Sequence, residues 1–74
     1  MKTILITGAS SGIGYATAKI LAKGNRLILC GRRLERLQQL QTELSDTPTL
    51  LLQFDVANKE EVFSAFDSIP TKWQ

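Results

Sequence analysis

The sequence predicts an α/β fold in which helices cover both faces of a parallel β-sheet, a doubly wound arrangement. Two observations predict it. Three short apolar runs alternate with three segments of helical periodicity, which gives the order β-α-β-α-β-α. Each run is continuously apolar, as is typical of parallel strands that are buried on both faces. We expect the strand order 3-2-1, and therefore only the first half of such a fold.

The first strand is predicted at Ile4–Ile6, where three aliphatic residues precede Thr7-Gly8. Beyond it the apolar spacing is helical, and Gly24-Asn25 ends this first helix because glycine accepts the left-handed conformation. The apolar residues that we expect on its buried side are Ile13, Ala16, Ile20 and Leu21.

The second strand is predicted at Arg26–Cys30 and the second helix at Arg33–Leu44. Cys30 follows three aliphatic residues, so we expect it to pack within the strand. Pro48 separates this helix from the next strand, because proline cannot continue the helical hydrogen bonds. The expected buried side of the helix consists of leucines at helical spacing, Leu34, Leu37, Leu40 and Leu44.

The third strand is predicted at Thr49–Phe54. Asn58 is a candidate N-cap of the third helix, with Glu61 three residues later as in a capping box. Pro70 ends the helix. Its expected apolar side consists of Val62, Phe63, Phe66 and Ile69.

Composition excludes several classes of function. The net charge of +2 is too small to indicate a nucleic-acid surface. The single cysteine permits no internal disulfide, and without histidine there is no metal-binding cluster. No apolar run approaches the ~20 residues of a membrane helix, and the N-terminus does not have the pattern of a signal peptide. We therefore expect a protein of the cytoplasm that acts without a membrane or nucleic-acid partner.

The loop Thr7-Gly8-Ala9-Ser10-Ser11-Gly12-Ile13-Gly14 joins the first strand to the first helix. Unpaired N–H groups and the helix dipole make such a junction an anion site. Gly8 permits a tight turn, Gly12 lets a diphosphate approach the backbone, and Gly14 lets the helix pack closely. A merely flexible turn is the alternative, but its place in the first βα unit favours a dinucleotide site. The expected contacts are Gly8, Ser10, Ser11, Gly12, Ile13 and Gly14.

This loop resembles the cofactor loop of the short-chain dehydrogenase/reductase family. The family pattern Thr-Gly-x-x-x-Gly-x-Gly is matched by Thr7, Gly8, Gly12 and Gly14. The resemblance covers the whole chain and implies that residues 1–74 are the N-terminal half of an NAD(P)-binding Rossmann domain. It also implies that Asp55 holds the adenine amino group, assisted by the backbone of Val56. A turn role for Asp55 is the alternative.

The end of the second strand indicates which cofactor is bound. NAD-binding units place an acid there, but this chain has Gly31 followed by Arg32 and Arg33. A glycine leaves room for a 2′-phosphate, and two arginines suit it as planar cations. Solvated loop charges are the alternative. The sequence favours NADP over NAD, and we assign Arg36 to local pairing with Glu35 or Glu43.

The catalytic serine and Tyr-x-x-x-Lys of the family lie downstream in its members, so we expect no catalytic residue within this chain. Tyr15 and Lys19 match the spacing formally, but they lie on the first helix, away from the nicotinamide position. Three motifs in combination resemble the NADP-dependent serine/3-hydroxy acid dehydrogenase branch: Gly31 to Leu37, Gln53-Phe54-Asp55-Val56, and Ser68-Ile69-Pro70-x-x-Trp73. This resemblance implies hydride transfer between NADP(H) and an alcohol or carbonyl substrate, in a tetramer. A non-catalytic NADP-binding sensor is the alternative.

A domain of 74 residues has a marginal core. The first strand would also leave one edge unpaired, which invites aggregation. We therefore expect these residues to be the front of a longer protein, with a free-standing domain as the alternative.

Overall fold

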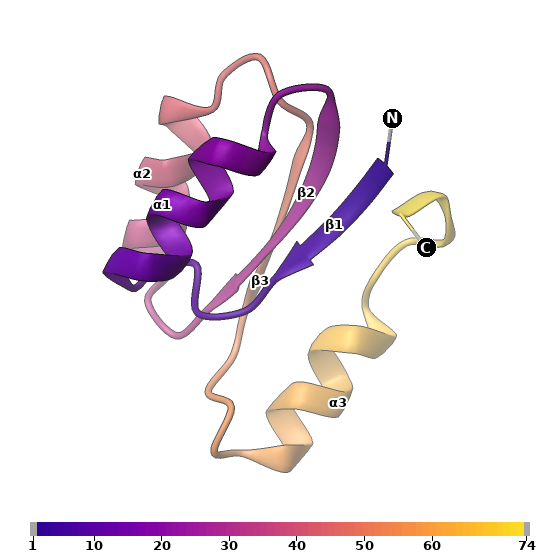
Figure 1. Cartoon of the computed structure of the whole chain (residues 1–74). Coiled ribbons are helices and arrows are strands. Elements are labelled where there is room, and N and C mark those ends of the chain that lie inside the picture. Colours follow the sequence, from indigo (N-terminus) through magenta and orange to yellow (C-terminus); the bar gives the residue numbers. More distant parts are fainter. Residues whose placement is uncertain (1, 74) are drawn as a thin grey trace.

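The structure, a computed structural model, describes residues 2–73 and confirms the α/β order (Figure 1). Three strands alternate with three helices, and a short 3₁₀ turn follows the last helix. The elements are β1 (Lys2–Ile6), α1 (Gly12–Leu21), β2 (Asn25–Gly31), α2 (Leu34–Glu43), β3 (Thr49–Gln53), α3 (Lys59–Asp67) and η1 (Thr71–Trp73).

The strands form one parallel sheet with β2 between β1 and β3, which is the expected order. Ile4 pairs with Leu27, and Leu29 pairs with Leu51. Because all three strands run in the same direction, their carboxyl ends meet at one edge. The loops after β1, β2 and β3 therefore converge there.

Successive residues of β2 face opposite sides of the sheet and supply two separate cores. Leu27 and Leu29 pack beneath α1 and α2, whereas Ile28 and Cys30 face the α3 side. Figure 1 shows α1 and α2 together on one side of the sheet and α3 on the other. The fold is doubly wound, as expected.

The helix ends follow their sequence signals. Gly24 has φ +78°, as expected for a left-handed residue after α1. The side chain of Asn58 accepts a hydrogen bond from the N–H of Glu61, so the expected cap of α3 is confirmed. Leu37 and Leu40 are fully buried under α2, while Leu44 is half-buried and Leu34 lies at the exposed margin.

The expected buried side of α1 is wrong. Ile13 and Ile20 are 84% and 78% exposed, and Ala16 is also exposed. Leu21 alone of the expected residues packs against the core. The residues that face the sheet are small and recur every fourth position: Gly14, Ala18 and Ala22. Small side chains let the helix backbone approach the sheet, so this side has little hydropathy signal.

The expected apolar side of α3 is correct only in part. Phe63 is 67% exposed, and Ala65 packs against the sheet side instead. Phe66 is partly exposed, but its ring meets Phe54 edge to face at 5.8 Å between centroids. Val62 is half-buried against the same core, so α3 has no fully buried residue.

Arg26 forms hydrogen bonds that connect η1 to the amino end of β1. Its guanidinium donates to Thr3 Oγ1 at 2.6 and 3.0 Å and to the Lys72 carbonyl at 3.0 Å. It also stacks over the Trp73 ring, 5.1 Å from the centroid. The segment after α3 thus forms η1 and returns to the amino ends of the strands.

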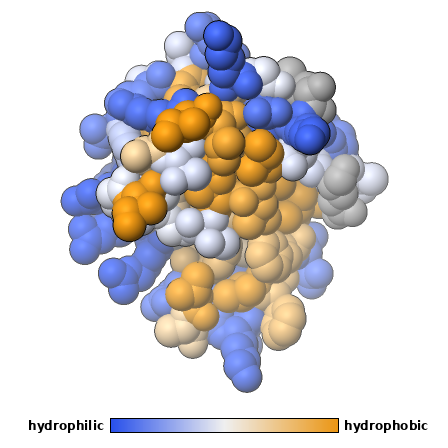
Figure 2. All heavy atoms as spheres, viewed as in Figure 1, coloured by the Kyte–Doolittle hydropathy of each residue, from blue (hydrophilic) through white to orange (hydrophobic). Residues whose placement is uncertain are grey.

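One edge of β1 has no partner among the described strands. Figure 2 shows apolar side chains gathered in the middle of the face on which β1 lies. Leu5, in the centre of this strand, is 41% exposed. No helix within residues 2–73 is long and apolar enough to cross a membrane.

Candidate nucleotide site at the carboxyl edge of the sheet

Gly8 and Gly14 shape the turn from β1 into α1. Gly8 has φ +66°, a conformation that side chains disfavour, so the expected tight turn is present. A Cβ added at Gly14 would lie 2.1 Å from the Gly8 carbonyl oxygen. The first turn of α1 therefore rests directly on the loop, which only glycine at position 14 permits.

The loop leaves backbone donors at its exposed side. Among the described residues, the N–H groups of Gly12 and Ile13 donate to no protein acceptor. A Cβ added at Gly12 would meet nothing within 4 Å, so the space beside these N–H groups is open. Free amides at the positive end of a helix dipole are suited to an anion such as a diphosphate.

Ser10 and Ser11 have different roles in the loop. Ser11 is the N-cap of α1: its hydroxyl donates to the Gly8 carbonyl at 2.7 Å and accepts from the Gly14 N–H at 3.4 Å. Within residues 2–73 the Ser10 hydroxyl has no hydrogen-bond partner. Ser10 is thus the serine whose donor remains available to a ligand.

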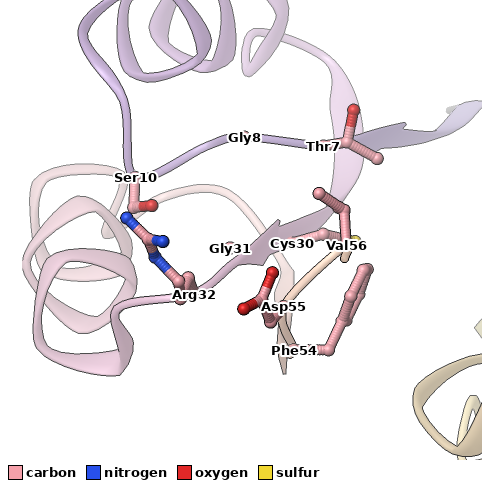
Figure 3. A pocket seen from close by; sticks show the side chains of 9 residues that line it. All are labelled: Thr7, Gly8, Ser10, Cys30, Gly31, Arg32, Phe54, Asp55 and Val56. Atoms are coloured by element: carbon pink, nitrogen blue, oxygen red, sulfur yellow. The ribbon is translucent and has the colours of Figure 1, made fainter. Parts of the chain in front are cut away.

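A cavity of about 150 Å³ opens beside the loop, between the ends of all three strands (Figure 3). Its walls include Phe54 and Val56, and the Asp55 carboxylate lies at its margin (Figure 3). A mainly apolar cavity with a few polar side chains at its margin is suited to a purine base. Its residues are Thr7, Gly8, Ser10, Cys30, Gly31, Arg32, Phe54, Asp55 and Val56.

Asp55 has the turn role that was the alternative, and it retains a free acceptor. Its Oδ1 accepts from the Ala57 N–H at 2.9 Å, which closes the turn after β3. Its Oδ2 has no partner in the described chain, and neither has the N–H of Val56. A carboxylate acceptor next to a backbone donor matches the amino and ring-nitrogen edge of adenine.

Phe54 and Cys30 were not expected at this site. Phe54 is buried and donates its N–H to the Gly31 carbonyl at 3.0 Å, which fixes the wall of the cavity to the end of β2. Burial raises the pKa of the Cys30 thiol to about 11. Cys30 therefore stays neutral near pH 7 and forms an inert part of the wall. Their positions directly before Asp55 and Gly31 were the signal in the sequence.

A second cavity, of about 280 Å³, lies beside the first and is lined by three positively charged side chains. Its residues are Ser10, Ser11, Arg32, Arg33 and Arg36. Arg33 is the N-cap residue of α2 and makes no side-chain cap hydrogen bond. Three cations thus lie at the positive end of a helix, an arrangement that the helix dipole disfavours and that a bound phosphate would offset.

The expected ion pair between Arg36 and Glu43 does not form. Glu43 binds Lys19 at 2.9 Å, and Arg36 forms no ion pair with any described residue. Arg36 instead lines the cationic cavity, because it lies in the first turn of α2, three residues after the N-cap residue Arg33. Sequence reasoning missed this residue, although its spacing from Arg32 was visible.

Tyr15 and Lys19 are not arranged for proton transfer. The Tyr15 hydroxyl is buried without a hydrogen-bond partner in the described chain, and Lys19 Nζ lies 5.3 Å from the centre of the Tyr15 ring. Lys19 is instead paired with Glu43, on the side of α1 that faces α2. The formal Tyr-x-x-x-Lys match is a packing pair.

Comparison with known proteins identifies the family. The family model described as short chain dehydrogenase matches residues 2–74. The chain belongs to the short-chain dehydrogenase family. It is 50% identical over 72 residues to a probable NADP-dependent dehydrogenase of Dichelobacter nodosus, covering 96% of this chain and 67% of that protein. It is 38% identical over 71 residues to the NADP-dependent 3-hydroxy acid dehydrogenase YdfG of Escherichia coli K12, covering 95% of this chain.

The fold of this short-chain dehydrogenase chain also matches solved structures. The closed form of a serine dehydrogenase in complex with NADP⁺ superimposes with a TM-score of 0.86 at 36% identity, over 96% of this chain. The chain spans 28% of the length of YdfG and 29% of that serine dehydrogenase. The matched part is therefore the Rossmann half that carries the glycine loop.

Proposed function

We propose that the protein is an NADP-dependent oxidoreductase that transfers hydride between NADP(H) and an alcohol or carbonyl substrate. In this proposal residues 1–74 are the N-terminal half of its dinucleotide-binding domain and hold the adenosine and diphosphate parts of the cofactor. Reactive residues for the substrate are not assigned to this segment. The cytoplasm and a homotetramer, which the family resemblance implies, belong to the same proposal.

One observation carries it: the 150 Å³ cavity and the cationic cavity share Ser10 and Arg32, beside the glycine loop. A nucleotide that places its base against Phe54 and Asp55 brings its ribose 2′ position toward Arg32 and Arg33. Its diphosphate then reaches the free N–H groups of Gly12 and Ile13. NADP differs from NAD by a 2′-phosphate, and this arrangement provides charge for it.

The substrate class that we propose is a 3-hydroxy acid such as serine. It is supported by the names of two similar proteins, the 3-hydroxy acid dehydrogenase YdfG and the serine dehydrogenase. Turnover of serine or allo-threonine with NADP⁺ by the whole gene product, followed by NADPH absorbance, tests it. Tight NADPH binding without turnover of any 3-hydroxy acid would favour the sensor function instead.

The cofactor assignment is tested by replacing Arg32 and Arg33 with alanine in the whole gene product. Charge-assisted hydrogen bonds contribute about 1.5–3 kcal/mol each, so we expect NADPH affinity to fall about a hundredfold or more. NADH affinity should change by less than about threefold, because NADH has no 2′-phosphate. Isothermal titration calorimetry measures both.

Lys23→Ala is the matched control, because it removes an exposed cation at the far end of α1. It should leave both affinities unchanged. Equal losses for NADPH and NADH in the arginine variant would show that the arginines do not bind the 2′-phosphate.

A further inference from the structure

Within the described chain, residues 59–73 cover the second face of the sheet; they comprise α3 and η1 and are called here the α3–η1 segment. The buried core beneath this segment is formed by Ile28, Cys30, Leu52 and Phe54. The segment itself contributes side chains that are only partly buried: Val62, Ala65, Ile69 and Trp73. Because none of its residues is buried completely, few apolar contacts oppose its separation from the sheet.

A turn at residues 55–58 connects the α3–η1 segment to β3 at the carboxyl edge of the sheet. The Asp55 carbonyl accepts from the Asn58 N–H at 2.9 Å, so these four residues form one turn. Directly before it, the Phe54 N–H donates to the Gly31 carbonyl at 3.0 Å, which fixes the end of β3. Movement about this turn would therefore displace the segment and leave the strands in place. The turn supplies two residues to the 150 Å³ cavity, Asp55 and Val56.

Arg26 holds the other end of the α3–η1 segment at the amino edge of the sheet. Its guanidinium donates to the Lys72 carbonyl at 3.0 Å and lies over the Trp73 ring, 5.1 Å from the centroid. The same guanidinium donates to Thr3 Oγ1 on β1, which fixes its own position. Figure 1 shows η1 near the amino end of β1, at the opposite edge from the turn before α3. One side chain thus connects the far end of the segment to two strands.

We propose that the α3–η1 segment is a hinged cover of the nucleotide site, which Arg26 holds closed and which a bound adenine nucleotide stabilises in the closed position. The hinge is the turn at residues 55–58. Arg26 is a positioning residue, since it lines neither the 150 Å³ cavity nor the cationic cavity. This inference rests on the position of adenine in the proposed function.

Nucleotide binding and closure are linked because the nucleotide would contact the hinge itself. Opening moves the Asp55 carboxylate out of the cavity wall and separates Phe66 from Phe54, so the open form lacks the complete site. A ligand that binds only the closed form lowers the open population by the factor 1 + [L]/Kd. None of residues 59–73 lines the 150 Å³ cavity, so protection of these residues by a nucleotide would report closure rather than direct contact.

Hydrogen exchange of the whole gene product, measured on peptides from residues 59–73, tests this link. The probe is 5′-AMP, because it contains the adenine that the cavity would bind. At about ten times its Kd, 5′-AMP should slow exchange of these amides about tenfold. If calorimetry shows that 5′-AMP binds but exchange of residues 59–73 is unchanged, the cover is wrong and the proposed function stands. If neither 5′-AMP nor NADPH binds, both are wrong.

Arg26→Met tests how the segment is held closed, because methionine keeps an apolar stem but neither donates a hydrogen bond nor carries charge. Cys30, the single cysteine of the 74 residues, is the reporter, since it is buried beneath the segment. Without nucleotide, alkylation of Cys30, quantified on its own peptide, should be at least about tenfold faster in this variant. Exchange should accelerate in residues 59–73 and stay unchanged in β2 and α2, which a general loss of stability would not produce.

Arg26→Lys is the conservative variant and also decides if Arg26→Met does not fold. Lysine keeps the charge near the Trp73 ring but lacks the planar fork that reaches Thr3 and Lys72 together. Alkylation of Cys30 in this variant should therefore be faster than in wild type and slower than in Arg26→Met.

Lys19→Gln is the matched control, because Lys19 also combines an ion pair with a position over an aromatic ring. Its partners are Glu43 and Tyr15, on the side of the sheet that α1 and α2 cover. This variant should leave Cys30 alkylation and exchange of residues 59–73 unchanged. Equal acceleration in the Lys19 and Arg26 variants would show that general destabilisation exposes Cys30. Wild-type rates in the Arg26 variants would show that Arg26 does not hold the segment closed, and either result would overturn the proposal.

Discussion

Two glycines of the same loop perform separable tasks. Gly14 is required by the fold, because its missing side chain lets α1 rest on the Gly8 carbonyl. Gly12 faces open space and adjoins the free N–H groups. The sequence predicts a glycine at each position, but only the structure separates the residue that packs from the residue that leaves room for a ligand.

The variants Gly14→Ala and Gly12→Val should therefore fail in different ways. Alanine normally gains about 0.5–1 kcal/mol over glycine within a helix, but here the clash of its Cβ costs more. We expect Gly14→Ala to lower the free energy of unfolding by roughly 1–3 kcal/mol or more, measured by urea denaturation. The free energy of unfolding of the Gly12→Val variant should lie within about 1 kcal/mol of the wild-type value.

In the whole gene product, Gly12→Val should also bind NADPH and NADH more than tenfold more weakly, because lost hydrogen bonds to a charged diphosphate each cost about 1.5–3 kcal/mol. Wild-type affinity in this variant would show that the loop is only a connector.

At the scale of elements, the three helices differ in how firmly they are held. α1 contributes Ala18 and α2 contributes Leu37 and Leu40 to the core, all fully buried. α3 buries no residue completely and depends on partial contacts such as Phe66 against Phe54. Because Phe54 also forms a wall of the 150 Å³ cavity, this ring pair is one of the contacts through which α3 supports the nucleotide site.

Hydrogen exchange should rank the elements accordingly. We expect the amides of α3 to exchange with solvent faster than those of β2 and α2, because few buried contacts oppose their local opening. Mass spectrometry of peptides covering each element measures this. Protection of α3 equal to that of β2 would contradict the packing described.

The same elements show what a sequence can predict. The strands, the helix caps and the fold order follow from apolar runs and from Gly24, Asn58 and Pro70. The sheet-facing side of α1 could not be predicted from apolar periodicity, because Ala18 and Ala22 fit there through their small size rather than their hydropathy. The glycine loop and Asp55 could be placed by motif, whereas Arg36 joins its cavity only through the crossing of α2 beside the loop.

At the scale of the whole molecule, the edge of β1 that has no partner strand within residues 2–73 favours association with other chains. An unpaired apolar strand is a template for pairing with another chain. Leu5 is near the middle of that strand and 41% exposed, which is unusual for a strand of a parallel sheet.

Leu5→Lys should therefore increase the solubility of the isolated 74-residue chain, because charge on an edge strand opposes intermolecular pairing. Light scattering at increasing concentration measures the effect. Ile20→Lys is the control, since Ile20 is more exposed but lies on α1. An equal gain from both variants would show that general surface hydrophobicity, rather than the strand edge, causes association.

The hydrogen bonds that Arg26 makes to Thr3 and Lys72 have a practical consequence for experiments on this protein. Arg26 gathers Thr3 and Lys72 at the amino ends of the strands, opposite the loops that converge on Ser10. An affinity tag or fluorophore attached next to Lys2 would consequently lie on the reverse side from the nucleotide. Immobilisation through that point should leave the binding edge facing solution.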